Sequence, residues 1–268
     1  MKTSAEFEIK VSGGRITKAQ VMPDGSCKVM VELVTTTTED TTCHQLESIF
    51  KRVPASELRL DDAFMKHQPK TNAERNFKEL VETAIKNGLK DFWRPVYDPS
   101  FDDNGRIYYE PGKMPAVGKS YNWWEKNAKV FCPERGSRIG TKSEYIAFLA
   151  VLIKDLVTAG KSVEWAWNAV CNDSKELGHY WNSKDAKHAK HAFETTGSRD
   201  ICGWYDLANS FKILEEDEEA VGFWLAGGNY NDVGCNCPLA DLFLYDFRDS
   251  GNCDCCGWLV LTEGSTDH

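Results

Sequence analysis

Residues 222–261 read GFWLAGGNYNDVGCNCPLADLFLYDFRDSGNCDCCGWLVL, and this stretch decides how the rest of the chain is interpreted. Its two edges, residues 223–226 and 257–261, are short apolar runs next to glycine, a pattern typical of buried strands. The interior, residues 229–256, holds five of the ten cysteines, four asparagines and five aspartates in no periodic order. We therefore expect two scaffold strands that enclose an irregular segment.

The interior also lacks Lys, Glu, Gln, Met and Trp. These types make up 60 of the 268 residues, so about six are expected in the 28 positions, and the chance of none is on the order of one in a thousand. An Asn codon (AAC or AAT) cannot reach any of these five types when only its adenines change, whereas it can reach every type present. The absence therefore indicates a mutational origin rather than a requirement of folding.

The overall composition is that of a globular protein, with 41% hydrophobic and 27% charged residues. A net charge of −9 argues against a nucleic-acid or anionic-membrane binder, which needs a basic face. The first residues contain no apolar signal region, and no run approaches the ~18 apolar residues of a membrane span. We expect a chain made in the cytoplasm without a signal peptide and without membrane insertion. Buried free thiols are expected at the scattered cysteines Cys27, Cys43, Cys132, Cys171 and Cys202.

The N-terminal part of the chain reads as β-structure. In residues 5–34, Phe7, Ile9 and Val11 alternate with polar residues, and a Pro-Asp-Gly turn at 23–25 precedes a second apolar run. We predict a small β-rich module over residues 1–68, with the boundary near Pro69. Residues 69–268 then form a second, helix-led domain.

Helical patterns follow in the second domain. Residues 71–87 begin with a Thr-x-x-Glu capping box and carry one apolar stripe. Residues 141–159 begin with the same box but are apolar nearly all round, which predicts a buried central helix, and residues 162–170 continue as a helical piece. Residues 97–111 read as a hairpin whose acidic turn lacks the ligand spacing of a calcium loop. The fold class is therefore predicted to be α+β.

Two further clusters are interpreted as surface. His179, His188 and His191 have a spacing typical of no metal site, and residues 215–219 are an acidic run that reads as a solvated loop.

Four short motifs carry a resemblance to a known family. RIGTKSEY at 138–145 resembles the "R-L-P-T-x-x-E-W" segment of formylglycine-generating-enzyme-like domains, a branch of the C-type lectin fold. GWYDLANSF at 203–211 is similar to "G-L-Y-D-M-x-G-N-V-W-E-W", WLAGG at 224–228 to "R-G-G-S-W", and GWLV at 257–260 to "G-F-R-L". Their order over residues 92–262 implies a C-type-lectin-like domain, but the catalytic cysteine pair and metal ligands of the enzymatic members are missing.

Within this fold, the adenine-reachable segment lies where variable proteins of diversity-generating retroelements carry their randomised residues. The chain resembles such a variable protein, from a divergent branch, because the arginine-rich consensus of the last strands is absent. In that family an error-prone reverse transcriptase mutates adenines of a template copy that replaces the 3′ end of the gene. The resemblance implies a non-enzymatic receptor-binding protein with a variable region at about 222–261, of phage or prophage origin.

The physical chemistry of the segment agrees with this interpretation, because loops on a rigid scaffold can change without unfolding the protein. Adenine changes in Asn codons also yield Tyr, Ser, Gly and Asp, the types enriched in antibody combining sites. The aromatic residues are the candidate anchors of an interface, while residues 238–240 and Arg248 are expected to hold the loops. The candidate ligand-binding residues are Asn229, Tyr230, Asn231, Asp232, Val233, Cys235, Asn236, Cys237, Phe243, Leu244, Tyr245, Phe247, Asp249, Ser250, Asn252, Cys253, Asp254 and Cys255.

Alternatives remain open at this point. The cysteines at 235, 237, 253, 255 and 256 could hold a zinc ion in a structural site, although their spacing is not that of common zinc motifs. The segment could also be an irregular core region, or the chain an enzyme on the same fold that uses Cys202 or His179. We expect no catalytic residue, metal or cofactor. The expected partner is a variable protein or glycan on a cell surface, with the N-terminal module joining copies of the chain or a virion.

Overall fold

The computed structural model describes residues 15–21, 27–32, 49–183, 195–216, 222–246, 248–249, 251 and 254–262. The chain divides into two units, Met1–Ser48 and Ile49–His268, and each is described by itself. In the first unit, β1 (Arg15–Val21) pairs antiparallel with β2 (Cys27–Glu32). The predicted second strand of the N-terminal part is confirmed, whereas the expected strand at residues 7–11 and the turn at 23–25 lie outside the described residues.

The division between the units falls at residues 48–49, and not near residue 68 as the sequence suggested. The reason is that β3 (Phe50–Val53) pairs with β4 (Phe92–Pro95) of the second unit. The 3-10 turns η1 (Ala55–Glu57) and η2 (Ala63–Lys66) then bury apolar side chains in its core, and the Trp167 indole donates a hydrogen bond to the Phe64 carbonyl at 3.0 Å.

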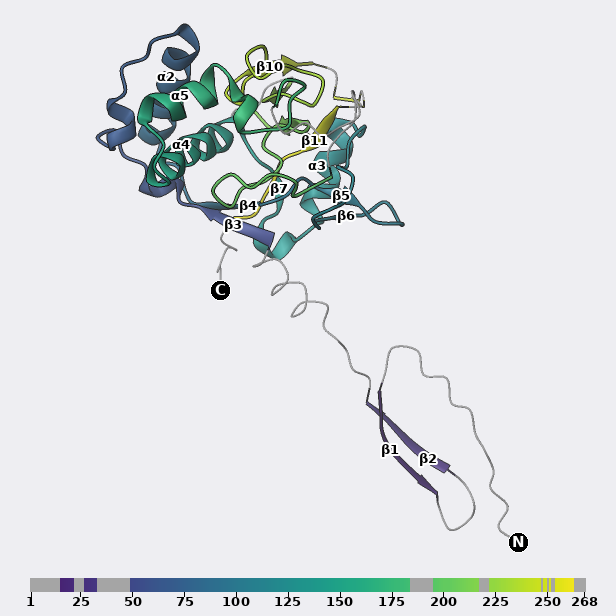
Figure 1. Cartoon of the computed structure of the whole chain (residues 1–268). Helices are drawn as coiled ribbons and strands as arrows, with labels where there is room; N and C mark the ends of the chain where they lie inside the picture. The colour runs from purple at the N-terminus through teal and green to yellow at the C-terminus, as the bar shows by residue number, and fades with distance from the viewer. Residues whose placement is uncertain are drawn as a thin grey trace. The chain divides into compact units, whose positions relative to one another are not determined.

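Three helices gather on one side of the second unit (Figure 1). They are α2 (Asn72–Lys86), α4 (Lys142–Thr158) and α5 (Val163–Cys171), so the three predicted helices are confirmed. Helix α4 packs against both α2 and α5, and 11 of its residues are buried, as the all-round apolar pattern predicted. The helix α3 (Tyr121–Lys129) was not predicted.

The two predicted capping boxes differ in the structure. At α4 the box is complete, because the Thr141 hydroxyl accepts from the Glu144 N–H and the Glu144 carboxylate accepts from the Thr141 N–H. At α2 the Thr71 hydroxyl accepts from the Glu74 N–H, but the Glu74 carboxylate accepts from the Lys70 N–H instead. His67 lies beside this carboxylate, 3.2 Å away.

The largest sheet of the second unit has the strand order β10-β9-β8-β11. Its strands are β8 (Phe211–Leu214), β9 (Phe223–Ala226), β10 (Leu242–Tyr245) and β11 (Cys255–Gly257), with β11 parallel to β8 and the other pairs antiparallel. Strand β12 (Leu259–Val260) pairs with β7 (Arg138–Ile139), and β5 (Ser100–Phe101) pairs with β6 (Ile107–Tyr108) in the predicted hairpin.

Trp258 joins the helices to the strands in one core. Its side chain is 3% exposed, and its ring lies 5.3 Å from that of Tyr145 and 6.2 Å from that of Phe148 on α4. A Cβ atom added at Gly257 would lie 2.5 Å from the Trp124 ring of α3, which explains why glycine precedes the tryptophan. The second unit is therefore α+β, as predicted. No helix of the described residues has the length and apolar character that a membrane crossing requires.

Candidate functional site

The two edges of residues 222–261 are buried framework, as the sequence predicted. In β9, Phe223, Leu225 and Ala226 are buried, and every residue from Cys255 to Leu261 is buried as well. Leu261 also exchanges two backbone hydrogen bonds of 2.8 Å with Trp93 of β4. The segment between these edges is consequently held at both ends by the core.

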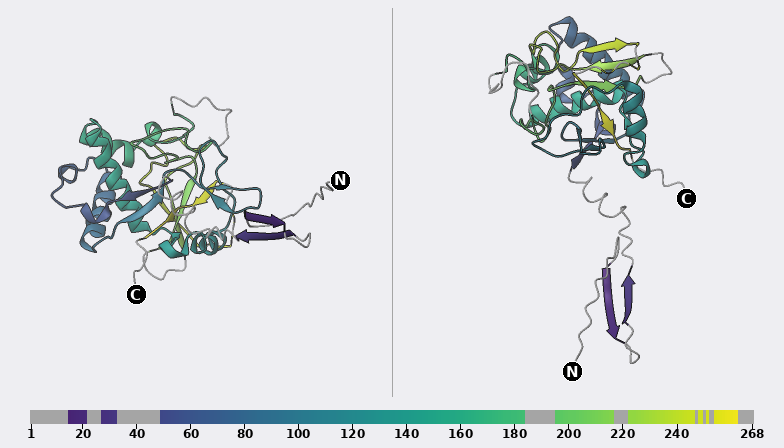
Figure 2. Two further views of the ribbon diagram at one scale, coloured as in Figure 1. Left: turned by 90° about the horizontal axis from the view of Figure 1, so that it is seen from below. Right: turned by 90° about the vertical axis from the view of Figure 1, so that its right-hand side faces the viewer.

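Strand β10 lies at one edge of the sheet and is exposed, whereas β11 at the other edge is buried. Phe243, Leu244 and Tyr245 retain 38%, 55% and 42% of their accessible surface. Figure 2 shows β10 at the rim of the second unit, with β9 as its neighbour. Exposed apolar surface of this kind marks sites of interaction more often than inert surface.

The side chains of β10 alternate between the two faces of the sheet. On one face, Phe243 contacts Phe211 of β8 and Tyr245 contacts Phe223 of β9, with ring centroids 6.1 and 6.0 Å apart. On the other face, Leu244 lies directly opposite Trp224 in the register of the two strands. Both faces of strand β10 thus offer apolar surface to a ligand, and side chains of β8 and β9 pack against these faces.

The loop after β9 is fixed through its backbone and presents several side chains outward. The Asn229 side-chain oxygen accepts from the Asn231 N–H at 2.7 Å, which forms a tight turn. Further along, the Gly234 N–H donates to Asn182 and the Gly234 carbonyl accepts from the Ser174 N–H, both at 3.0 Å. The exposed side chains of this loop are Asn231, Cys235 and Asn236.

Residues 238–240 hold the loop to the helices, as predicted. Leu239 is fully buried, its N–H donates to the Ser174 hydroxyl at 2.9 Å, and its carbonyl accepts from the Tyr145 hydroxyl at 3.0 Å. The Ala240 N–H donates to the Val170 carbonyl at 3.1 Å. These bonds tie the segment directly to α4 and α5.

Arg248 has the predicted supporting role at the other end of β10. Its guanidinium donates to the Gly222 carbonyl at 2.8 Å and lies 4.7 Å from the centre of the Tyr121 ring. The neighbouring Asp249 is exposed and accepts a hydrogen bond from the Asn122 side chain of α3.

Two candidate contact residues are buried and leave the contact set. Asn229 is 3% exposed because its side chain closes the turn, and Cys255 is 1% exposed because β11, at the end of the sheet beside β8, is covered by helix α3. The residues of intermediate burial are Tyr230, Asp232, Val233, Cys237 and Asp254. Phe247, Ser250, Asn252 and Cys253 lie outside the described residues.

The cysteines of the segment do not gather in the described part of the chain. Cys235 is exposed in the loop, whereas Cys255 and Cys256 are buried in β11, and burial raises the pKa of the Cys256 and Cys237 thiols to about 12. No group of three His, Cys, Asp or Glu side chains suited to a metal occurs among the described residues. Cys253 is not among them.

The acidic run and the histidines are only partly described. Glu216 is not simply solvated, because it pairs with Lys142 at 2.7 Å and accepts a hydrogen bond from the Trp224 indole. Glu215 joins α4 through a hydrogen bond from the Lys142 N–H to its carbonyl, at 2.9 Å. His179 is 7% exposed, so it is not a surface residue as expected. Residues 184–194 and 217–221 are outside the description.

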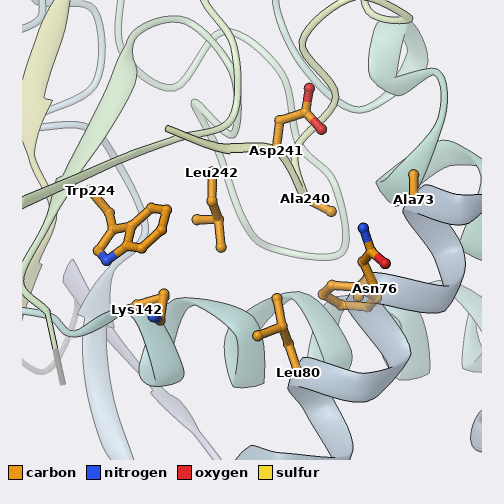
Figure 3. A pocket seen from close by; sticks show the side chains of 9 residues that line it. Ala73, Asn76, Leu80, Lys142, Trp224, Ala240, Asp241 and Leu242 are labelled. Atoms are coloured by element: carbon orange, nitrogen blue, oxygen red, sulfur yellow. The ribbon is translucent and has the colours of Figure 1, made fainter. Parts of the chain in front are cut away.

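A pocket that the sequence did not reveal lies between the sheet and the helices. It has a volume of about 320 Å³ and is bounded by α2, the start of α4, β9 and the residues before β10. Figure 3 shows Trp224 and Leu242 directed toward Lys142 and Leu80, with Asp241 at the opposite rim. Burial raises the pKa of Asp241 to about 6, and no described residue donates a hydrogen bond to its carboxylate. The pocket is therefore lined by apolar side chains together with Lys142 and Asn76, and the Asp241 carboxylate at its rim accepts no hydrogen bond from a described residue.

A buried ionic network lies beside strand β8. The Lys212 ammonium of β8 contacts both oxygens of Asp98 at 2.6 and 2.7 Å, and each residue is at most 3% exposed. The Ser210 hydroxyl donates to the same carboxylate at 2.9 Å. Burial, together with Asp98, raises the pKa of Asp206 to about 7, and burial lowers the pKa of the nearby Arg94 to about 10. All of these groups are buried, so we infer that the network stabilises the fold and does not contact a ligand.

No protein-family model matches the chain, and no curated protein matches it. Among solved structures, the chain is similar to the one described as "Crystal Structure of CarF", with 12% sequence identity and a TM-score of 0.45. The similarity covers 65% of this chain and 87% of that chain. A likeness at this level carries no inference about function.

Proposed function

We propose that the chain is a non-enzymatic ligand-binding protein whose variable region, residues 222–261, is diversified by a retroelement through adenine-directed mutagenesis. The proposal includes a C-type-lectin-like fold for the second unit, a phage or prophage origin, and a protein or glycan ligand on a cell surface. The N-terminal module would join the chain to a larger assembly or to its own copies.

One observation carries the proposal. The segment whose residue types are all reachable from Asn codons contains the exposed edge strand β10 and an exposed loop, while its flanks are buried framework. A surface that is to change in sequence must lie where substitutions do not unfold the protein, and it must rest on residues that do not change. The division between Phe243–Tyr245 and the buried residues from Gly257 to Leu261 meets both requirements.

The resemblance to C-type-lectin-like domains gains support from the position of its motifs. The segment at residues 138–145 opens the buried helix α4 with a complete capping box. The segment at 257–260 supplies the tryptophan that packs on this helix. The positions of these two motifs support the proposed fold.

The proposal is tested by a matched pair of codon libraries. In the first, the codons of Asn231, Cys235, Asn236, Leu244 and Asp249 vary at their first two bases and end in C. In the second, the same scheme is applied to five buried codons, those of Phe223, Leu225, Ile213, Leu259 and Val260. We expect most members of the first library and few members of the second to fold, measured by protease resistance.

Ligand selection completes the test. Members of the first library are selected against several unrelated bait proteins, and different baits are expected to enrich different residues at the varied positions. If the varied positions unfold the protein as often as the buried ones, or if no bait enriches any combination, the proposed function is wrong.

A further inference from the structure

The free side of strand β10 carries backbone groups that face away from the sheet. The Gly227 N–H donates to the Asp241 carbonyl at 3.0 Å, which makes residues 227 and 241 a hydrogen-bonded pair in the register of β9 and β10. Because such pairs alternate along an antiparallel ladder, Phe243 and Tyr245 bond to β9, and the N–H and C=O groups of Leu242 and Leu244 point outward. No described residue pairs with this side of the strand.

Strand β10 is short and flanked by aspartates, but within its four residues it carries no lysine, proline or bulge. Natural edge strands carry a lysine, a proline or a bulge, which prevents another chain from pairing with them. Strand β10 reads Leu-Phe-Leu-Tyr, its pairing with β9 is regular, and three of its four side chains are exposed. An edge of this kind is a template for an added strand, in which main-chain hydrogen bonds give affinity and side-chain pockets give specificity.

We infer that the ligand of this surface is an extended basic segment of a partner protein, which adds to the sheet as a strand beside β10. This inference rests on the proposed ligand-binding function and names the class of ligand. The partner strand would receive and donate hydrogen bonds at Leu242 and Leu244, and its side chains would pass over Phe243 and Tyr245 on one face and over Leu244 on the other.

The charge around β10 is the reason for a basic partner. Asp241 and Asp246 stand at the two ends of the strand, Asp249 is exposed just beyond it, and the chain carries a net charge of −9. Asp241 also borders the pocket lined by Trp224, Leu242 and Lys142, and no described residue donates a hydrogen bond to its carboxylate. A lysine or arginine of the partner strand can lay its apolar stem along Leu242 and place its charge at Asp241, because the Lys142 ammonium over the Trp224 ring is already paired with Glu216.

A second copy of this chain fits the edge less well. Antiparallel pairing of β10 with itself would place Asp241 and Asp246 of both copies in one interface. Four carboxylates would then meet between two chains that each carry a net charge of −9, which is unfavourable.

The test uses the full chain and a displayed library of random linear peptides as the probe. Leu244→Pro removes an outward N–H without touching the ladder to β9, because the Leu244 N–H points to the free side. Leu244→Thr is the matched control, since it shortens the same side chain but keeps the N–H. We expect enriched peptides to alternate apolar residues with Lys or Arg, and to bind Leu244→Pro about ten-fold more weakly than Leu244→Thr.

A second measurement leaves the protein unchanged. An enriched peptide is N-methylated in two phases, at its odd-numbered residues or at its even-numbered residues. One phase should abolish binding and the other should preserve it, because only every second N–H of an added strand faces β10. Equal binding in both phases would overturn the strand model even if Leu244→Pro proved unfolded.

The remaining outcomes separate this inference from the proposed function. Peptides that ignore Leu244→Pro but lose affinity on substitution of Asn231 or Asn236 would overturn the added strand and leave a diversified loop site. A wild-type dimer that Leu244→Pro dissociates in sedimentation would assign the edge to a second copy, and the absence of any enriched peptide would also overturn the inference. If neither edge nor loop substitutions alter any ligand, the proposed function fails as well.

Discussion

Removal of the Lys212 ammonium should destabilise the framework beneath the variable region. Lys212→Met keeps most of the side-chain length but leaves the Asp98 carboxylate, which is 3% exposed, without its cation. Breaking a buried ion pair on one side costs about 3–5 kcal/mol. The Ser210 hydroxyl still donates to Asp98 and the buried Arg94 guanidinium is nearby, so we expect the lower end, about 3 kcal/mol.

Urea denaturation at pH 7.5 measures this loss, and a thermal scan should show a fall in Tm of roughly 6–12 °C, from about 2–4 °C per kcal/mol for a domain of this size. The double variant Asp98→Asn with Lys212→Met removes the unpaired carboxylate as well and should recover part of the stability. The coupling free energy between the two substitutions should be about 2 kcal/mol. A loss below about 1 kcal/mol for Lys212→Met, or strictly additive single variants, would refute the buried pair.

Three further predictions concern the surface and its support. Burial raises the pKa of Asp241 to about 6, so ionisation of this carboxyl lowers the stability of the folded protein as the pH rises from about 4 to 6. Asp241→Asn should therefore raise the free energy of unfolding at pH 7 by about 1 kcal/mol, a value reduced for the partial exposure of the side chain. Below pH 4 the same variant should have no effect, and urea denaturation over a pH series measures both values. Gly257→Ala should cost about 1–3 kcal/mol in the same assay, because the new Cβ meets the Trp124 ring, and an unchanged midpoint would show that the site has room. Trp258→Ala should cost about 3–5 kcal/mol and Leu244→Thr less than about 1 kcal/mol, and similar losses would contradict the division into framework and surface.

The parts of the fold that the sequence predicted were those with a strong local signal. Thr141 and Glu144 predict the start of α4, and the all-round apolar pattern predicts its burial. The hairpin at 97–111 follows from its Asp-Asn-Gly turn, in which the Asp102 carboxylate accepts the N–H groups of Asn104 and Arg106. These features depend on residues close together in the sequence, so they can be predicted without knowledge of the tertiary structure.

What the sequence could not supply depends on contacts between distant segments. The pairing of β3 with β4 moves the unit boundary from residue 68 to 48, and nothing in residues 50–53 alone indicates a partner forty residues later. The ion pair joins Asp98 to Lys212, which are separated by 114 residues. The composition of residues 229–256 indicated a surface, but the burial of Asn229 and Cys255 depends on strand pairing and turn geometry.

On the proposed function, residues 229–256 are one sample of a sequence that a retroelement rewrites. The measurement that tests it most directly is the sequence of the DNA that flanks this gene. We expect a reverse-transcriptase gene and a near-copy of the 3′ end, in which the codons of exposed residues such as Asn231, Asn236 and Leu244 read AAC or AAT, and those of the buried Trp258 and Leu259 match the gene. A flank without a template copy, or a copy whose mismatches fall on the buried codons instead, would contradict it.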